Sequence, residues 1–153
     1  MSKNEEFFPL EDALCFALYN AHRLMNQAYR PYLSELGLTY PQFLVLICLW
    51  NRDNQSLTEL GETLLLDSGT LTPLIKRLIE SGFINKERSS SDERKITVSL
   101  TKEGKKLREK TDKIPNGMFC KLKLSEKKFI TIREEVKTLI KNLKESVNSE
   151  LTN

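Results

Sequence analysis

The sequence predicts a mostly α-helical fold of six helices with one small β-hairpin. Apolar residues recur at helical spacing over most of the chain, and the period changes to two between residues 83 and 100. Two short helices joined by a tight turn come directly before that change. Two such helices followed by a basic hairpin make a winged helix-turn-helix. We expect a single domain over residues 1–153, with the winged core at about residues 39–100.

Composition excludes several other classes of protein. A hydrophobic fraction of 39% and a charged fraction of 29% are typical of a globular chain. There is no apolar run long enough for a membrane helix, and the acidic N-terminus does not resemble a signal peptide, so we expect a cytoplasmic protein without a membrane partner. One histidine and three widely spaced cysteines favour neither a metal site nor a disulfide framework, and no cofactor is expected.

Charge is unevenly spread along the chain. Residues 1–75 carry nine acids and four bases, whereas residues 76–110 carry eleven bases and six acids. The overall charge of +3 therefore conceals a basic segment that suits a polyanion such as double-stranded DNA. Charge alone fits an ordinary solvated surface equally well.

The first two helices are predicted by periodicity and by their end signals. Residues 10–36 form one long helix, which Gly37 ends in a left-handed conformation. Its length of about 40 Å exceeds what a small winged domain needs, so part of it is expected to pack against a second subunit. Thr39 and Pro41 begin a second helix, and the apolar run 43–50 marks that helix as buried.

The helix-turn-helix and the wing follow in order. A capping box at residues 56–59 opens a third helix, and a turn at residues 66–69 leads into a fourth helix that stops at Gly82. Residues 83–88 and 95–100 alternate in polarity as two strands, and a polar tip lies between them. This order of elements favours DNA binding as the role of the basic residues over an ordinary solvated surface.

The predicted DNA contacts are hydroxyl or charged residues on the fourth helix and the wing. A helix in the major groove reads base edges with its first residues, while hydroxyls and bases around it hold phosphates. Arg94 at the wing tip is expected to enter a minor groove, and Asp92 to hold Arg94 or Arg88 by an ion pair. The full set is Ser68, Thr70, Thr72, Lys76, Arg77, Lys86, Arg88, Asp92, Arg94 and Lys95.

Two more helical segments complete the chain. Thr101 begins a fifth helix, which the Pro-Asn-Gly at residues 115–117 interrupts. Ser125 caps a sixth helix that runs to about Val147 with an apolar face. These segments, at about residues 102–149, and the first helix, at about residues 9–36, are expected to form the dimer layer of a homodimer.

Four short motifs point to a known family. They are Leu-Cys-Phe-Ala-Leu-Tyr at 14–19, Leu-Thr-Tyr-Pro-Gln-Phe at 38–43, Leu-Asp-Ser-Gly-Thr-Leu-Thr-Pro-Leu at 66–74, and Asp-Glu-Arg at 92–94 followed by Ser-Leu-Thr at 99–101. With them, residues 14–104 resemble the MarR family of transcription regulators, in its OhrR branch, which senses organic hydroperoxides. The resemblance implies a homodimer with a winged core, a pseudo-palindromic operator, repression of target promoters and no enzymatic activity.

The same resemblance implies that Cys15 is the oxidised thiol and that Tyr19, Tyr29 and Tyr40 hold its thiolate. A thiolate is the nucleophile that reacts with a peroxide, and no base lies beside Cys15 in the sequence. Hydrogen bonds from phenols must therefore stabilise the anion. Tyr29 lies about 21 Å along the same helix, so only an antiparallel partner helix can bring it to Cys15. Spacing alone would favour an ordinary buried cysteine.

The other cysteines receive different predictions. Cys48 lies in the apolar second helix and is assigned to the core. Some relatives in the branch carry a resolving cysteine between the fifth and sixth helices, where Cys120 lies. The resemblance therefore implies an inter-subunit disulfide between Cys15 and Cys120 under oxidant. A small thiol that caps the sulfenic acid of Cys15 is the open alternative, with Cys120 incidental.

Three other functions fit parts of the pattern. A regulator of the same fold can be released from DNA by a phenolic or lipophilic ligand at the dimer interface. A thiol peroxidase would need a cation that activates Cys15, and the sequence offers none beside it. A pure protein-interaction module is the third, and a steep salt dependence of DNA binding would exclude it.

Overall fold

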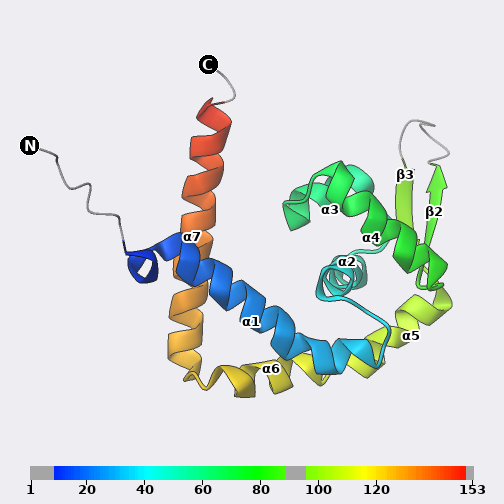
Figure 1. Cartoon of the computed structure of the whole chain (residues 1–153). Helices are drawn as coiled ribbons and strands as arrows, with labels where there is room; N and C mark the ends of the chain where they lie inside the picture. The colour runs from blue at the N-terminus through cyan, green and yellow to red at the C-terminus, as the bar shows by residue number, and fades with distance from the viewer. Residues whose placement is uncertain (1–8, 89–95, 151–153) are drawn as a thin grey trace, which may run out of the picture. The chain divides into compact units, whose positions relative to one another are not determined.

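The computed structural model describes residues 9–88 and 96–150, and its chain forms two compact units, Met1–Pro115 and Asn116–Asn153. The first unit holds the 3₁₀-helix η1 (Leu10–Asp12), the helices α1 (Leu14–Ser34), α2 (Tyr40–Asn51), α3 (Leu57–Leu64), α4 (Ser68–Glu80) and α5 (Lys102–Thr111), and the strands β1 (Gln55–Ser56), β2 (Ile84–Arg88) and β3 (Ile96–Leu100). Helix α6 (Ile114–Leu122) leads into the second unit, which holds α7 (Glu126–Glu150) (Figure 1). No helix in these ranges is sufficiently long and apolar to cross a bilayer.

The first predicted helix is divided in the structure. Ala13 is extended, with φ −75° and ψ 117°, so η1 ends before it and α1 begins after it. Cys15 is therefore the second residue of α1. The predicted end is confirmed, because Gly37 has a φ of +67° and Leu38 N–H donates to the carbonyl oxygen of Leu33 at 2.9 Å. This hydrogen bond pairs a carbonyl group that the end of the helix would otherwise leave without a partner.

The helix-turn-helix forms where the capping residues predict it. The Ser56 hydroxyl accepts a hydrogen bond from the backbone N–H of Glu59 at 3.2 Å, and the Glu59 carboxylate accepts from the backbone N–H of Ser56 at 2.8 Å. The sequence predicts the start of α4 at about Gly69, and the helix begins one residue earlier, at Ser68, because Asp67 caps it, accepting from Thr70 N–H at 2.9 Å. Gly82, with a φ of +74°, follows its end.

The core of the first unit lies around α2. This helix contacts α1, α3, α4, α5 and β3, and Val45, Leu46 and Leu49 are fully buried. On α4 the predicted apolar stripe faces this core, with Leu71, Ile75 and Leu78 buried. Helix α4 is therefore fixed by one face, and its opposite face is left to solvent.

The predicted hairpin is confirmed and belongs to a three-stranded antiparallel sheet of order β1-β3-β2. Strands β2 and β3 run side by side, with Ile84 opposite Leu100 and Arg88 opposite Ile96 (Figure 1). Strand β1 was not predicted; its two residues pair with Val98 and Thr97. The predicted fold class, mostly helical with a small wing, is confirmed.

The predicted fifth helix consists of two helices, and the break does not lie at Pro115. Helix α5 ends at Thr111, and α6 begins at Ile114, so Pro115 and Gly117 lie within the first turn of α6. Proline is accepted in a first turn because its missing N–H would have no helical partner there. The proline thus starts a helix where the sequence pattern indicated an interruption.

Candidate functional site

The exposed face of α4 carries the hydroxyls and bases that the sequence predicts for DNA. Ser68, Thr70, Thr72, Lys76 and Arg77 are all exposed. The Thr70 hydroxyl donates to the Asp67 carboxylate at 2.8 Å, so it is left to accept from a base amino group. Their location fits the prediction, and their contacts with DNA stay a prediction.

The two bases of α4 differ in their surroundings. Lys76 Nζ lies 3.9 Å from a carboxylate oxygen of Glu80, and both side chains are well exposed. Such a pair contributes little and does not compete with a phosphate. Arg77 lines a polar hollow with Gly37 and Thr39, so it lies toward the turn between α1 and α2.

A groove between α3 and α4 adds a residue that the sequence pattern missed. Thr58, in the first turn of α3, lines this groove together with Ser68 and Thr72. It is the second residue after the Ser56 cap, so the position of the capping box in the sequence could have identified it. The hydroxyls of both helices therefore gather at one surface.

The wing is described in part. Lys86 is exposed on β2 opposite Val98, and the backbone of Arg88 pairs with Ile96. Asp92, Arg94 and Lys95 lie outside the described residues. The prediction that Arg94 enters a minor groove stays a prediction.

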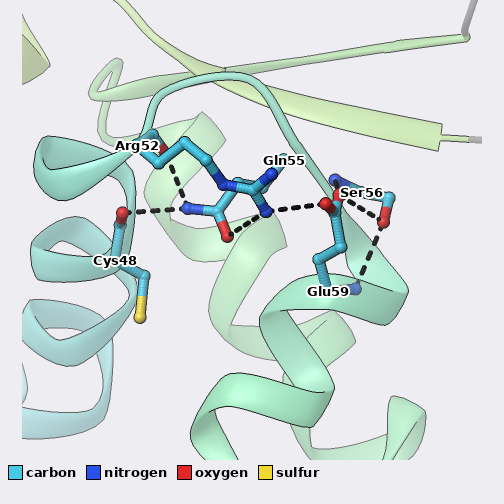
Figure 2. A network of polar contacts seen from close by, with 5 residues as sticks. All are labelled: Cys48, Arg52, Gln55, Ser56 and Glu59. Carbon is cyan, nitrogen blue, oxygen red and sulfur yellow. Dashed lines mark hydrogen bonds and ion pairs between the residues drawn. The ribbon is translucent and has the colours of Figure 1, made fainter.

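A polar network joins the end of α2 to the start of α3 (Figure 2). The buried side-chain amide of Gln55 donates to the carbonyl oxygens of Cys48, at 2.9 Å, and of Arg52, at 2.6 Å. The Arg52 guanidinium donates in turn to the Glu59 carboxylate at 2.6 Å. Residues 51–55 are all polar and break the apolar pattern of α2. In the structure, this break ties the core helix to the helix-turn-helix.

The charge of Glu59 gives a pH-dependence that can be measured. The backbone N–H of Ser56, then the Arg52 guanidinium and the Ser56 hydroxyl, lower the pKa of Glu59 to about 2. A lowered pKa stabilises the fold above the ordinary value of 4.5, and that contribution is lost as the pH falls toward 2. Glutamine keeps the capping acceptor but removes the charge. The free energy of unfolding of Glu59→Gln, measured with urea, should therefore depend less on pH between 5 and 2 than that of wild type.

Glu62→Gln is the matched control for this prediction. Glu62 lies on the same helix, outside the network of Figure 2, and its replacement removes the same charge. If both variants depend on pH in the same way, the network around Glu59 does not stabilise the carboxylate.

Cys15 is exposed near the N-terminus of α1, and Tyr19, one turn later on the same helix, is 56% exposed. The Arg23 guanidinium lies over the Tyr19 ring, 5.7 Å from its centroid. Within the described residues, Cys15 is thus not packed among aliphatic side chains, as an inert core cysteine would be.

Tyr29 and Tyr40 form a second cluster at the other end of α1. Their ring centroids lie 4.5 Å apart, and Phe43 packs against Tyr29 at 6.3 Å. Burial, and for Tyr29 also repulsion by Tyr40, raises the pKa of both phenols, so both remain protonated donors at neutral pH. Fourteen residues of helix, about 21 Å, separate Tyr29 from Cys15. One chain alone does not bring this pair to the thiol.

The remaining cysteines differ in exposure. Cys48 is half-buried on α2, and burial raises the pKa of its thiol, which disfavours the reactive thiolate. The sequence predicts Cys48 in the core, whereas in the structure it lies at the edge of the buried set and not among its fully buried residues. Cys120 is exposed on α6, in the second unit.

Comparisons with known proteins agree with these features. The family described as transcriptional regulator SarA/Rot matches residues 27–114. The organic hydroperoxide resistance transcriptional regulator of Bacillus subtilis (strain 168) is 39% identical over 143 residues, which are 94% of this chain and 97% of that protein.

Solved structures of AbfR, a protein of Staphylococcus epidermidis, are also similar. Reduced AbfR bound to DNA is 36% identical with a TM-score of 0.74, over 88% of this chain and 94% of that chain. Disulfide-formed AbfR is 37% identical with a TM-score of 0.63, over 86% and 92%.

Proposed function

Because the chain belongs to the MarR family of transcriptional regulators, in the branch of the organic hydroperoxide regulators, we propose that it is a homodimeric DNA-binding repressor switched by oxidation of Cys15. The observation that carries the proposal is an exposed thiol at one end of α1 and two protonated phenols at the other end. We place the protein in the cytoplasm, where it reaches genomic DNA, and infer that its two units work as one MarR-type domain over residues 1–153.

An antiparallel partner helix completes the site. If α1 of a second subunit runs in the opposite direction, Tyr29 and Tyr40 of the partner subunit approach Cys15, while Tyr19 approaches it from the same chain. Phenol hydroxyls then donate to the sulfur and stabilise its anion without adding a cation. Position two of a helix adds a modest dipole effect in the same direction.

The chemistry at this site is a two-electron oxidation. The Cys15 thiolate attacks the terminal oxygen of an organic hydroperoxide, the O–O bond breaks, and the alkoxide leaves as an alcohol after taking a proton. The sulfenic acid is then attacked by Cys120 of the partner subunit, which forms a disulfide and releases water, or it is capped by a small thiol. Either product changes the packing at the dimer interface and hence the spacing of the two α4 helices.

The second copy has an apolar surface to cover. On α7, Ile132, Leu143 and Val147 are 44%, 54% and 54% exposed, and on α1, Leu14 and Leu24 are 61% and 63% exposed. Apolar side chains in such number are typical of an interface rather than of a free surface. This supports the expected dimer layer of N- and C-terminal helices.

The direct test is a mobility shift on the promoter of the protein's own gene. We expect reduced protein to bind, cumene hydroperoxide to lower the affinity by about tenfold or more, and dithiothreitol to restore it. An affinity that hydroperoxide leaves unchanged would refute the switch. The loss of binding in the presence of phenol or salicylate alone would favour the alternative, a ligand-released regulator. The hollow between α1 and α2, lined by Asn26, Arg30, Leu33 and Tyr40, is the place for that ligand.

A mixed dimer tests whether the site is shared between subunits. Tyr29→Phe and Cys15→Ser homodimers should each react slowly or not at all with hydroperoxide. A dimer of one Tyr29→Phe chain and one Cys15→Ser chain holds a single Cys15, and that thiol lies in a complete site, so all of it should react at the wild-type rate. Rapid mass spectrometry of affinity-tagged mixed dimers measures this. If Cys15 of the mixed dimer reacts as slowly as it does in the Tyr29→Phe homodimer, Tyr29 of the partner subunit lies outside the site.

Lys76 should contribute one phosphate contact to DNA binding. We expect Lys76→Ala to weaken binding to all sequences alike and to reduce the slope of log Kd against log salt by about one. Fluorescence anisotropy between 50 and 300 mM salt gives this slope. Lys106→Ala, which removes an exposed charge from α5, is the control, and an equal change of slope in both variants would contradict the assignment.

A further inference from the structure

We propose that the acidic start of one chain docks on a basic corner of a second copy, and that this contact guides Cys15 to Cys120 of the partner subunit. The acidic edge is Glu11 with Asp12, on η1. The basic corner is the junction of α6 and α7, with Lys121, Lys123, Lys127 and Lys128. The guidance of the thiols rests on the proposed function, whereas the docking itself is a separate claim.

Cys120 lies within the basic corner because the junction folds back on itself. The backbone N–H of Lys123 donates to the carbonyl oxygen of Cys120 at 3.3 Å. The rings of Phe119 and Phe129 meet edge to face at 5.4 Å and hold the end of α6 against the start of α7. Lys127 and Lys128, which precede Phe129 in the first turn of α7, are exposed.

The charge of the corner is strongly positive. Its four lysines are opposed by one acid, Glu126. The ion pairs in the described part of the chain do not include Lys123, Lys127 or Lys128. A group of exposed cations that outnumbers the acids beside it attracts an anionic surface.

The acidic edge lies close to Cys15 along the chain, as the basic corner lies close to Cys120. Glu11 and Asp12 are exposed, and the bonds from Asp12 N–H to Pro9 O and from Ala13 N–H to Leu10 O, both 3.1 Å, keep η1 tight. Cys15 follows within one turn. Among the described residues neither carboxylate joins an ion pair, and the first base of α1, Arg23, lies over the ring of Tyr19.

Each thiol thus lies beside charge of one sign, and the two signs are opposite. Opposite charges attract over about 10 Å at 0.1 M salt and over about 3 Å at 1 M. Within a dimer such attraction raises the effective concentration of one thiol at the other. A second copy of this chain fits the basic corner because it carries the matching acids next to the thiol that must arrive there.

Carbodiimide coupling of the reduced full-length protein tests the docking without any redox step. This reagent joins carboxylates directly to amines in contact. In dimers mixed from ¹⁴N and ¹⁵N chains, we expect linked peptides that pair Glu11 or Asp12 of one isotope with Lys127 or Lys128 of the other. If these inter-chain links do not form, the docking is overturned.

Charge reversal tests the consequence for the thiols. After addition of cumene hydroperoxide, non-reducing gels should show the cross-linked dimer forming about fivefold more slowly in Glu11→Lys/Asp12→Lys and in Lys127→Glu/Lys128→Glu. The protein that carries all four changes should return to within about twofold of wild type. The control Lys141→Glu/Lys144→Glu makes the same change of net charge further along α7 and should not slow the reaction.

The outcomes separate the two proposals. Equal rates in all variants would overturn the guidance although the disulfide forms. Inter-chain carbodiimide links without any disulfide would support the docking and remove Cys120 as the resolving thiol. A DNA salt slope reduced by about two in Lys127→Glu/Lys128→Glu would assign the corner to DNA and overturn the docking.

Discussion

Replacing Cys15 by serine is expected to leave the DNA affinity of the reduced protein within about twofold of wild type and to abolish the response to organic hydroperoxide. Cys15 is exposed at the second position of α1, so a hydroxyl in place of the thiol disturbs no packing within the chain. A serine hydroxyl is not oxidised by peroxides. The wild-type response, a loss of affinity of about 10- to 100-fold, corresponds to a coupling free energy of about 1.4 to 2.7 kcal/mol.

Fluorescence anisotropy on the promoter DNA, before and after hydroperoxide, measures this difference. Cys120→Ser is the control with the same chemical change at another exposed thiol. It should still lose DNA affinity when a small thiol is present, although it forms no cross-linked dimer. Release of Cys15→Ser by hydroperoxide would show that another group is the sensor.

Replacing Gly104 by alanine is expected to destabilise the winged core by about 3 kcal/mol. A Cβ at this position would overlap the backbone carbonyl oxygen of Phe83, which is held in place by the N–H of Thr101 at 3.0 Å. Gly104 is fixed as well, because its carbonyl oxygen accepts from the indole N–H of Trp50 at 2.9 Å. Neither backbone can move without breaking contacts between α5, the wing and α2.

Urea unfolding gives the change in free energy, with Gly37→Ala as the matched control. Gly37 has a left-handed backbone, with a φ of +67°, which favours glycine. No atom lies within 4 Å of the Cβ that alanine would add there. We expect its replacement to cost only about 1 kcal/mol, from the left-handed backbone. A Gly104→Ala variant no less stable than Gly37→Ala would contradict the close approach of α5 to Phe83.

The sequence alone predicted most of the helices because their signals are local. Capping by Ser56 and Glu59, and the left-handed glycines Gly37 and Gly82 that follow the ends of α1 and α4, each depend on residues within one turn. The exposed face of α4 was predictable for the same reason, since helical spacing separates Thr72 and Lys76 from the buried stripe. Local signals were misleading at Pro115, because the same residue can end one helix or begin the next.

The candidate site was predicted in part. The motifs predict Cys15, Tyr19, Tyr29 and Tyr40 as site residues, and these assignments stay a prediction, whereas helix geometry alone excludes an encounter of Cys15 with Tyr29 in one chain. The contact of Tyr29 with Tyr40, which fixes two donors together, depends on the packing of α1 on α2 and has no signature in either helix. The same holds for Thr58, which joins Ser68 and Thr72 at one groove only because α3 packs beside α4.

What the sequence by itself determined was the type and order of the elements and which face of each helix is apolar. Those properties follow from hydrogen bonds and side-chain spacing within a few residues. Only the tertiary structure decided the pairing of β1 with Val98, the network from Cys48 to Glu59 and the close approach of Gly104 to Phe83. Each of these joins groups that are far apart along the chain or meet only after it has turned, so no local preference specifies them.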